Sequence, residues 1–153
     1  MKREEELLLQ DLTSRLSFGV MCEYKNETYS TTKPLLLTDI CRVKTKTGFI
    51  YWDCYFEDNG GQDIPVEIVR PYLRPLSSMT EEELKEIQKI NWQFCKSKNV
   101  ECYVGAAYDR YCSVYQMADI LKYFNKHHFD YLGLIDLGMA IEVTKENNPY
   151  EKA

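Results

Sequence analysis

The sequence lacks any apolar stretch close to the ~20 residues that span a bilayer. Its first apolar run, Leu7 to Leu9, follows three glutamates, and it is too short and too acid-flanked for a secretion signal. We therefore expect a cytoplasmic protein with no membrane segment.

An excess of basic residues is also absent, because the chain has 19 Lys and Arg against 24 Asp and Glu, a formal net charge of −5 and a pI of about 5.1. A globally acidic protein is a poor electrostatic match for phosphate backbones and anionic membrane surfaces. The composition thus argues against nucleic acid as the partner, although the dispersed cations leave room for a local basic patch.

Histidine is scarce, and the two residues present, His127 and His128, are adjacent. Neighbouring side chains at a helix end point about 100° apart, so the pair rarely binds one ion, even with Asp130 close by. The nearest cysteines, Cys95 and Cys102, do not have zinc-ligand spacing. The sequence therefore predicts neither a metal site nor a cofactor.

A catalytic constellation is likewise missing. Without an export signal, the six cysteines are expected as reduced thiols, and only Cys112, just before a helix, has a setting that could activate a nucleophile. The acidic pairs Asp53 with Glu57 and Asp58 with Asp63 fit an exposed strand face and a solvated turn. No catalytic residue is predicted, and a small enzyme with a dispersed active site remains an alternative.

What the sequence does contain is a helix followed by strands. Leu8, Leu9, Leu12 and Leu16 form one apolar stripe within residues 3–16, which predicts a helix. Period-two alternation follows over residues 18–24, 49–57 and 64–68, with turns between the runs and Pro65 marking an edge strand. Residues 28–43 predict one or two further strands, interrupted near Pro34. We expect these short antiparallel strands to form a small β-barrel or a strongly bent sheet, and an SH3-like barrel is the favoured form.

The second half predicts two capped helices and a short extra strand. Thr80 and Glu83 form a capping box after a proline-punctuated connector, residues 70–76, and this helix should run to about Ser97. A short strand over residues 100–104 precedes a second box at Ser113 and its helix. Residues 139–143 predict a last strand, and the polar tail from residue 144 is expected to fray. The fold class is α+β, with residues 1–76 and 77–153 packing as one unit.

Two stretches carry a resemblance to a known family: Tyr72-Leu73-Arg74-Pro75-Leu76-Ser77-Ser78-Met79-Thr80-Glu81-Glu82-Glu83, and Phe124 to Ile135 followed by Gly138-Met139-Ala140. Together they resemble an abundant family of uncharacterised small proteins from gut bacteria, their phages and mobile elements. The chain departs from the family pattern at Leu76, Ser17 and Leu132. The resemblance implies a phage or mobile-element setting, and it supplies no activity.

The best candidate binding residues are aromatic and basic. Tyr51 and Tyr55 share the polar face of one predicted strand, and Arg70, Tyr72 and Arg74 follow soon after in the sequence. Aromatic and arginine side chains dominate protein interfaces, although they can also stack the bases of a single strand, and helices could instead cover this face. The sequence favours a non-enzymatic protein-binding or regulatory accessory, with a nucleic-acid-associated barrel module as the alternative.

Overall fold

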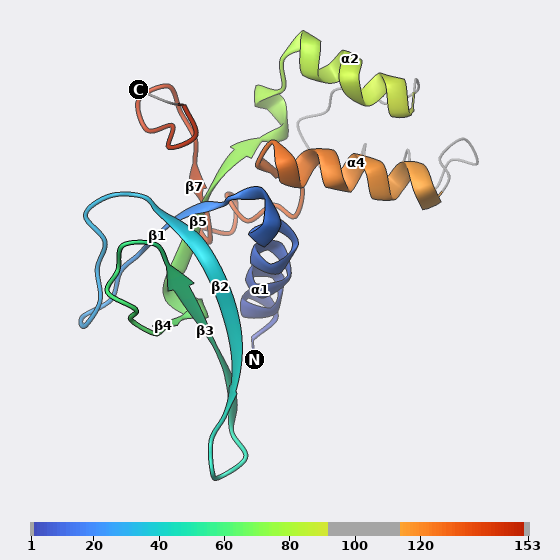
Figure 1. The fold of residues 1–153 in the computed structure, drawn as a ribbon. Coiled ribbons are helices and arrows are strands. Elements are labelled where there is room, and N and C mark those ends of the chain that lie inside the picture. The colour runs from blue at the N-terminus through green and yellow to red at the C-terminus, as the bar shows by residue number, and fades with distance from the viewer. Residues whose placement is uncertain (1, 92–113, 152–153) are drawn as a thin grey trace.

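The computed structural model describes residues 2–91 and 114–151, and it confirms an α+β fold. An N-terminal helix and most of the strands form one part of the molecule, and two further helices lie at the other end (Figure 1). The elements are α1 (Arg3–Arg15), β1 (Met21–Tyr24), β2 (Leu35–Lys44), β3 (Ile50–Phe56), β4 (Ile64–Pro65), β5 (Val69–Pro75), α2 (Glu81–Ile90), α4 (Val114–Lys126), β6 (Phe129–Asp130) and β7 (Ile141–Glu142), with single 3₁₀ turns at Leu16–Phe18, Val66–Ile68 and Leu76–Ser78.

The predicted N-terminal helix is confirmed as α1. Its three first-turn glutamates lie where the helix dipole favours negative charge. Leu8 and Leu12 are fully buried, and Leu9 and Leu16 pack against the same core while partly buried. The apolar stripe is therefore the face that attaches the helix to the sheet.

The sheet is mixed and is not closed, so the expected SH3-like barrel is not confirmed. Its strand order is β4-β3-β2-β1-β5-β6, with β7 also paired to β5, and both β6 and β7 run parallel to β5. The strand expected over residues 64–68 ends at Pro65, because the chain then makes a 3₁₀ turn. The resulting two-residue β4 is an edge strand, as its proline predicted, and it offers too little edge for closure.

The segment expected as a connector, residues 70–76, instead contributes most of β5. Its prolines cannot donate to a ladder, which is why the pattern favoured a connector. In the fold, Pro71 lies opposite Cys22 of β1 and Pro75 opposite Asp130 of β6. Leu73 is fully buried, so this strand is central to the sheet.

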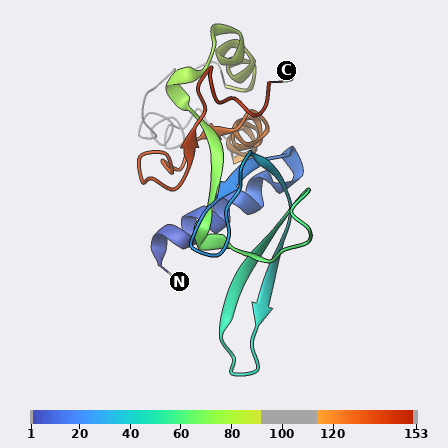
Figure 2. The ribbon, with the colours of Figure 1, turned by 90° about the vertical axis from the view of Figure 1, so that its left-hand side faces the viewer.

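The hairpin of β2 and β3 follows the sequence pattern in part, because β2 begins at Leu35 rather than residue 28 and Asp53, expected on an exposed face, is only 6% exposed. The expected turn ends at Gly48, whose φ of 85° suits glycine and whose N–H donates to the Thr45 carbonyl at 3.0 Å. Cys54 and Phe56 are buried on the predicted inner face of β3. In both ribbon views, the far end of the hairpin extends beyond the rest of the described chain (Figures 1 and 2).

Two clusters of buried side chains hold the fold together. The sheet core gathers residues from α1 and the strands, and it also includes Leu134 and Met139 from the second half of the chain. The helix core lies between α2, α4 and β6, around Ile87, Phe124 and Phe129. Leu132 packs against both clusters. The two parts expected from the sequence are therefore in direct contact.

The capping box at the start of α2 is confirmed: Glu83 N–H donates to the Thr80 hydroxyl at 3.2 Å, and Thr80 N–H donates to the Glu83 carboxylate at 3.0 Å. The helix ends at Ile90, earlier than expected, because Asn91 is extended. The strand expected over residues 100–104 and the capping box at Ser113 lie outside the described residues. None of the helices in the described part of the chain is long and apolar enough to cross a bilayer.

The tail expected to fray is attached to the body as far as residue 151, so that expectation is wrong. The Tyr150 hydroxyl donates to the Tyr72 carbonyl at 2.7 Å and accepts a hydrogen bond from the Met21 N–H at 3.1 Å. Its ring stacks on His128, with the centroids 3.6 Å apart. Tyr150 therefore attaches this end of the described chain to β1, to β5 and to the end of α4.

Candidate functional site

The structure does not bring the five predicted binding residues to one surface. Tyr51 is exposed on β3, and Tyr55 lies four residues along on the same face, partly buried. A hydrogen bond to Asp63 is the main cause that raises the pKa of Tyr55 to about 12. Tyr72 is only 5% exposed, and its hydroxyl donates to Glu23. Of the three tyrosines, only Tyr51 presents much of its ring to solvent.

The two predicted arginines are held by contacts within the chain. Arg70 donates from Nη1 to the carbonyl oxygens of Glu67 and Val69, both at 2.8 Å. Arg74 makes a bidentate pair with the Glu83 carboxylate at 2.7 Å, and its guanidinium lies over the Phe129 ring. These contacts stabilise the loop before β5 and the start of α2.

The most exposed apolar group of the strands lies at the far end of the hairpin. We call residues 42–52 the β2–β3 arm. Phe49 is 66% exposed, Ile50 39% and Tyr51 37%, and the rings of Phe49 and Tyr51 stack with centroids 6.2 Å apart. Large apolar side chains gathered at one exposed place on a protein mark an interaction site more often than scattered ones do.

The arm also concentrates positive charge. Arg42, Lys44 and Lys46 are all exposed, and no acidic residue occurs between Asp39 and Asp53. This segment therefore carries a local charge of the opposite sign to the chain as a whole, whose net charge is −5. The sequence prediction named neither these cations nor Phe49 as binding residues, since it judged charge over the whole chain and placed Lys44 and Lys46 in a turn. The long interval without acidic residues was the signal that could have found them.

The second region is concave and lies where residues 72–83 meet residues 124–135. The Arg74 N–H donates to the His128 carbonyl at 2.8 Å, which joins β5 to the end of α4. Beside this contact is an open pocket of about 420 Å³, lined by side chains of both stretches and of the tail: Arg74, Thr80, Glu83, Lys126, His127, His128, Asn148, Tyr150 and Glu151.

His128 is the most unusual residue of this pocket. It has a positive φ of 63°, it is 9% exposed, and its Nδ1 has no hydrogen-bond partner among the described residues. Burial lowers the pKa of its imidazole to about 4, and the charges of Arg15 and Arg74 act in the same direction. The ring is therefore neutral at pH 7, where it serves as a flat surface for Tyr150.

The possible metal ligands near His128 do not converge. His127 faces Glu83, with Nδ1 3.8 Å from the carboxylate, and stacks on Tyr123. Asp130 accepts hydrogen bonds from two backbone N–H groups of the following turn, at 2.9 and 2.8 Å. Within residues 2–91 and 114–151 no three His, Cys, Asp or Glu residues are grouped as metal ligands. The cysteines in these ranges, Cys22, Cys41 and Cys54, are free thiols.

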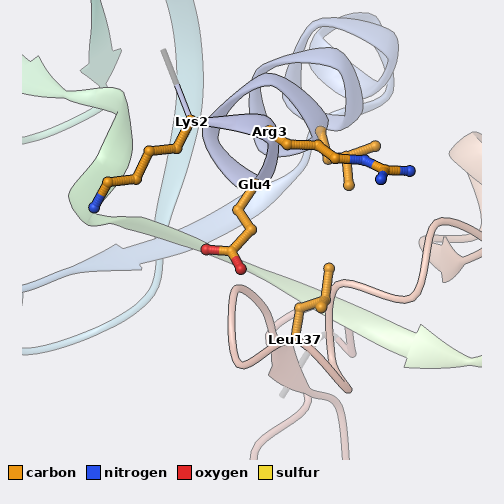
Figure 3. A pocket seen from close by; sticks show the side chains of 5 residues that line it. Lys2, Arg3, Glu4 and Leu137 are labelled. Carbon is orange, nitrogen blue, oxygen red and sulfur yellow. The ribbon is translucent and has the colours of Figure 1, made fainter.

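The third region is an open hollow of about 460 Å³ between the start of α1 and the turn that carries Leu137 (Figure 3). The side chains of Lys2, Arg3 and Glu4 spread apart around it, and all three are exposed. Leu137, 48% exposed, approaches from the opposite side. Long, solvated side chains of both signs make this an open groove, and it orients no group for chemistry.

No family model, curated protein or solved structure matches this chain.

Among the three regions, the arm has the properties of a contact surface. The pocket at His128 contains as many acidic as basic side chains that are charged at pH 7, and its strongest contacts fix the tail and the start of α2. The arm, in contrast, exposes the rings of Phe49 and Tyr51, which belong to neither core, and three cations for which the described part of the chain offers no ion pair. It is suited to binding another macromolecule.

Proposed function

We propose that this chain is a non-enzymatic binding protein that engages a protein partner through the β2–β3 arm. The observation that carries the proposal is the exposure of Phe49, Ile50 and Tyr51 at the far end of a hairpin that extends from the body. These side chains belong to neither core. Aromatic residues that become buried on association supply much of the energy of protein interfaces.

The resemblance to small proteins of gut bacteria, their phages and mobile elements suggests the setting. In that setting, a binding accessory of this size would act in the cytoplasm on a host protein, and would change what that protein does by occupying one of its surfaces. No catalytic group is required for such a role.

Single-stranded nucleic acid is the competing occupant, because the arm combines cations with aromatic rings. The two occupants differ in what they require. Nucleic acid binding by three cations would fall steeply with salt, although its bases would also stack on the rings. A protein partner depends on the apolar contact of Phe49 and Tyr51 as well.

The test is affinity capture from host lysate with the wild-type chain and with the Phe49→Ser, Tyr51→Ser double variant. The proposal expects a defined partner that the wild type retains and the double variant loses, while both chains melt at the same temperature. Leu137→Ser is the matched control, since it also removes an exposed apolar side chain, on a different surface. Equal capture by all three chains would contradict the proposal, as would capture of nucleic acid alone.

A further inference from the structure

The arm has open backbone edges as well as exposed side chains. β1 pairs with β2 only at Leu35 and Leu36, and β4 pairs with β3 only at Asp53 and Cys54. Along the arm, therefore, β2 and β3 have only each other as strand partners among the described residues. An uncovered edge of this kind is a template for one more strand.

The hydrogen-bond pattern shows which backbone groups face outward on β2. Thr45 N–H donates to the Phe49 carbonyl at 2.8 Å, so this is a hydrogen-bonded position of the antiparallel ladder. Such positions alternate with positions that do not bond across the pair. In the observed register, Arg42 lies opposite Trp52 and Lys44 opposite Ile50. Both pairs occupy positions at which the two strands do not bond to each other. Arg42 and Lys44 therefore direct their N–H and C=O groups away from β3, toward the open edge.

The side chains of the same two residues determine what an added strand would carry. Arg42 and Lys44 are two positions apart, so they lie on one face of the sheet, and both are exposed. Val43, between them, lies on the other face, opposite Tyr51. Cross-strand neighbours on one face contact each other, and opposite charges at such positions are favourable.

We propose that the partner segment is an extended peptide with alternating acidic and apolar residues, which adds as a strand to the β2 edge at Arg42–Lys44. This inference rests on the proposed function and names the chemistry of the partner. The acidic side chains meet Arg42 and Lys44, and the apolar residue between them lies beside Val43 and Tyr51. Backbone hydrogen bonds supply the pairing, as in other cases of strand addition.

Two other occupants fit the edge less well. A second copy of the chain, paired through the same edge, would place Arg42 and Lys44 against their own copies, and like charges directly opposite are destabilising. Single-stranded nucleic acid would satisfy the cations and stack on the rings, but it would not use the row of outward N–H and C=O groups. An acidic strand is the occupant that uses both features.

The test uses the full chain and a fluorescent peptide, Val-Glu-Val-Glu-Val-Glu-Val. We expect it to bind, with amide shifts in a nitrogen-15 NMR spectrum concentrated at residues 40–44, and to bind more weakly as salt increases. Two control peptides isolate the two features: one with lysine in place of glutamate, and one methylated on the glutamate amide nitrogens, which keeps the charge but cannot pair. Neither should bind. Equal binding by the methylated peptide would overturn strand addition.

The protein variant is Arg42→Glu with Lys44→Glu, and the matched control is Lys25→Glu with Lys33→Glu, which reverses two exposed charges outside the arm. We expect at least a tenfold loss of peptide affinity in the first and little change in the second. Equal losses would overturn the inference, and so would an oligothymidylate probe that binds the arm more tightly than the peptide, or a dimer formed through the arm.

The outcomes also separate this inference from the proposed function. If Phe49→Ser with Tyr51→Ser abolishes partner capture but the reversal at Arg42 and Lys44 leaves it unchanged, then the arm binds a protein and the acidic strand is wrong. If neither double variant affects capture, the proposed function itself is wrong.

Discussion

The guanidinium of Arg15 donates a 2.6 Å hydrogen bond from Nη2 to the backbone carbonyl of Phe129, 114 residues further along the chain. Both residues are fully buried. The same guanidinium pairs with Asp11 at 2.8 Å and lies near the Tyr131 ring. One side chain of α1 thus connects the helix beneath the sheet to the point where α4 leads into β6.

Arg15→Met should destabilise the fold by about 3–5 kcal/mol, because it leaves the Asp11 carboxylate buried without its partner. Urea denaturation measures the loss. The double variant Asp11→Leu, Arg15→Met removes both charges, so it should be more stable than Arg15→Met alone. A double variant as unstable as the sum of the two single variants would show that the pair does not act as a unit.

Stability should fall as the pH drops from 6.5 to about 4, because of His128. Its pKa is lowered from 6.5 to about 4 in the fold, so in this window the unfolded chain binds a proton that the folded chain does not. Above pH 6.5 this group does not reduce the free energy of unfolding, and at pH 4 it has lowered that free energy by about 2–3 kcal/mol. Asparagine tolerates the positive φ and does not titrate, so His128→Asn should flatten the pH dependence between 4 and 6.5. An unchanged slope in urea titrations across this window would contradict the assignment to His128.

A second acid-sensitive window belongs to Glu83. Burial alone would raise the pKa of this carboxyl, but the hydrogen bonds from Arg74 and Thr80 outweigh it and lower the pKa to about 2. The stability from this pair is present above pH 4.5 and is lost as the pH falls toward 2. Glu83→Gln should remove about 1–2 kcal/mol at pH 7, since the pair is partly open to water, and almost nothing at pH 2. Equal losses at both pH values would rule out the charged pair as the cause.

The attachment of the tail predicts an effect that a frayed end would not show. Tyr150→Phe keeps the ring on His128 but removes the hydroxyl that bonds Tyr72 and Met21, so it should cost about 1–2 kcal/mol. Tyr51→Phe, at an exposed ring, is the control and should leave stability unchanged. Thermal melting of the two variants makes the comparison, and equal melting temperatures would mean that the tail hydroxyl contributes nothing.

Local signals in the sequence predicted the elements that depend on neighbouring residues. The stripe on α1, the hairpin around Gly48 and the capping box at Thr80 are examples, because each is decided within a few positions. β5 was missed since its prolines argue against a strand, and its partners β1, β6 and β7 come from distant segments. The open sheet was missed for the same reason, because the parallel pairing of β6 and β7 with β5 joins distant segments and leaves no pattern in a short stretch of sequence.

The candidate site was predictable only in part. Tyr51 was named from its strand face, and it is exposed on the arm. Tyr55 was named from the same face, and Arg70, Tyr72 and Arg74 were added by closeness in sequence. The fold turns all four toward partners of their own. Exposure depends on how far the hairpin extends past the sheet, and no short window of sequence reports that distance.

Site-specific photo-crosslinking in the producing cells tests most directly whether the arm is where this protein meets its partner. A benzophenone amino acid is placed at Phe49 in one chain and at Leu137 in another, since both positions are exposed. The account predicts a discrete protein adduct from position 49 that is absent from position 137. No adduct at 49, or the same adduct from both positions, would contradict it.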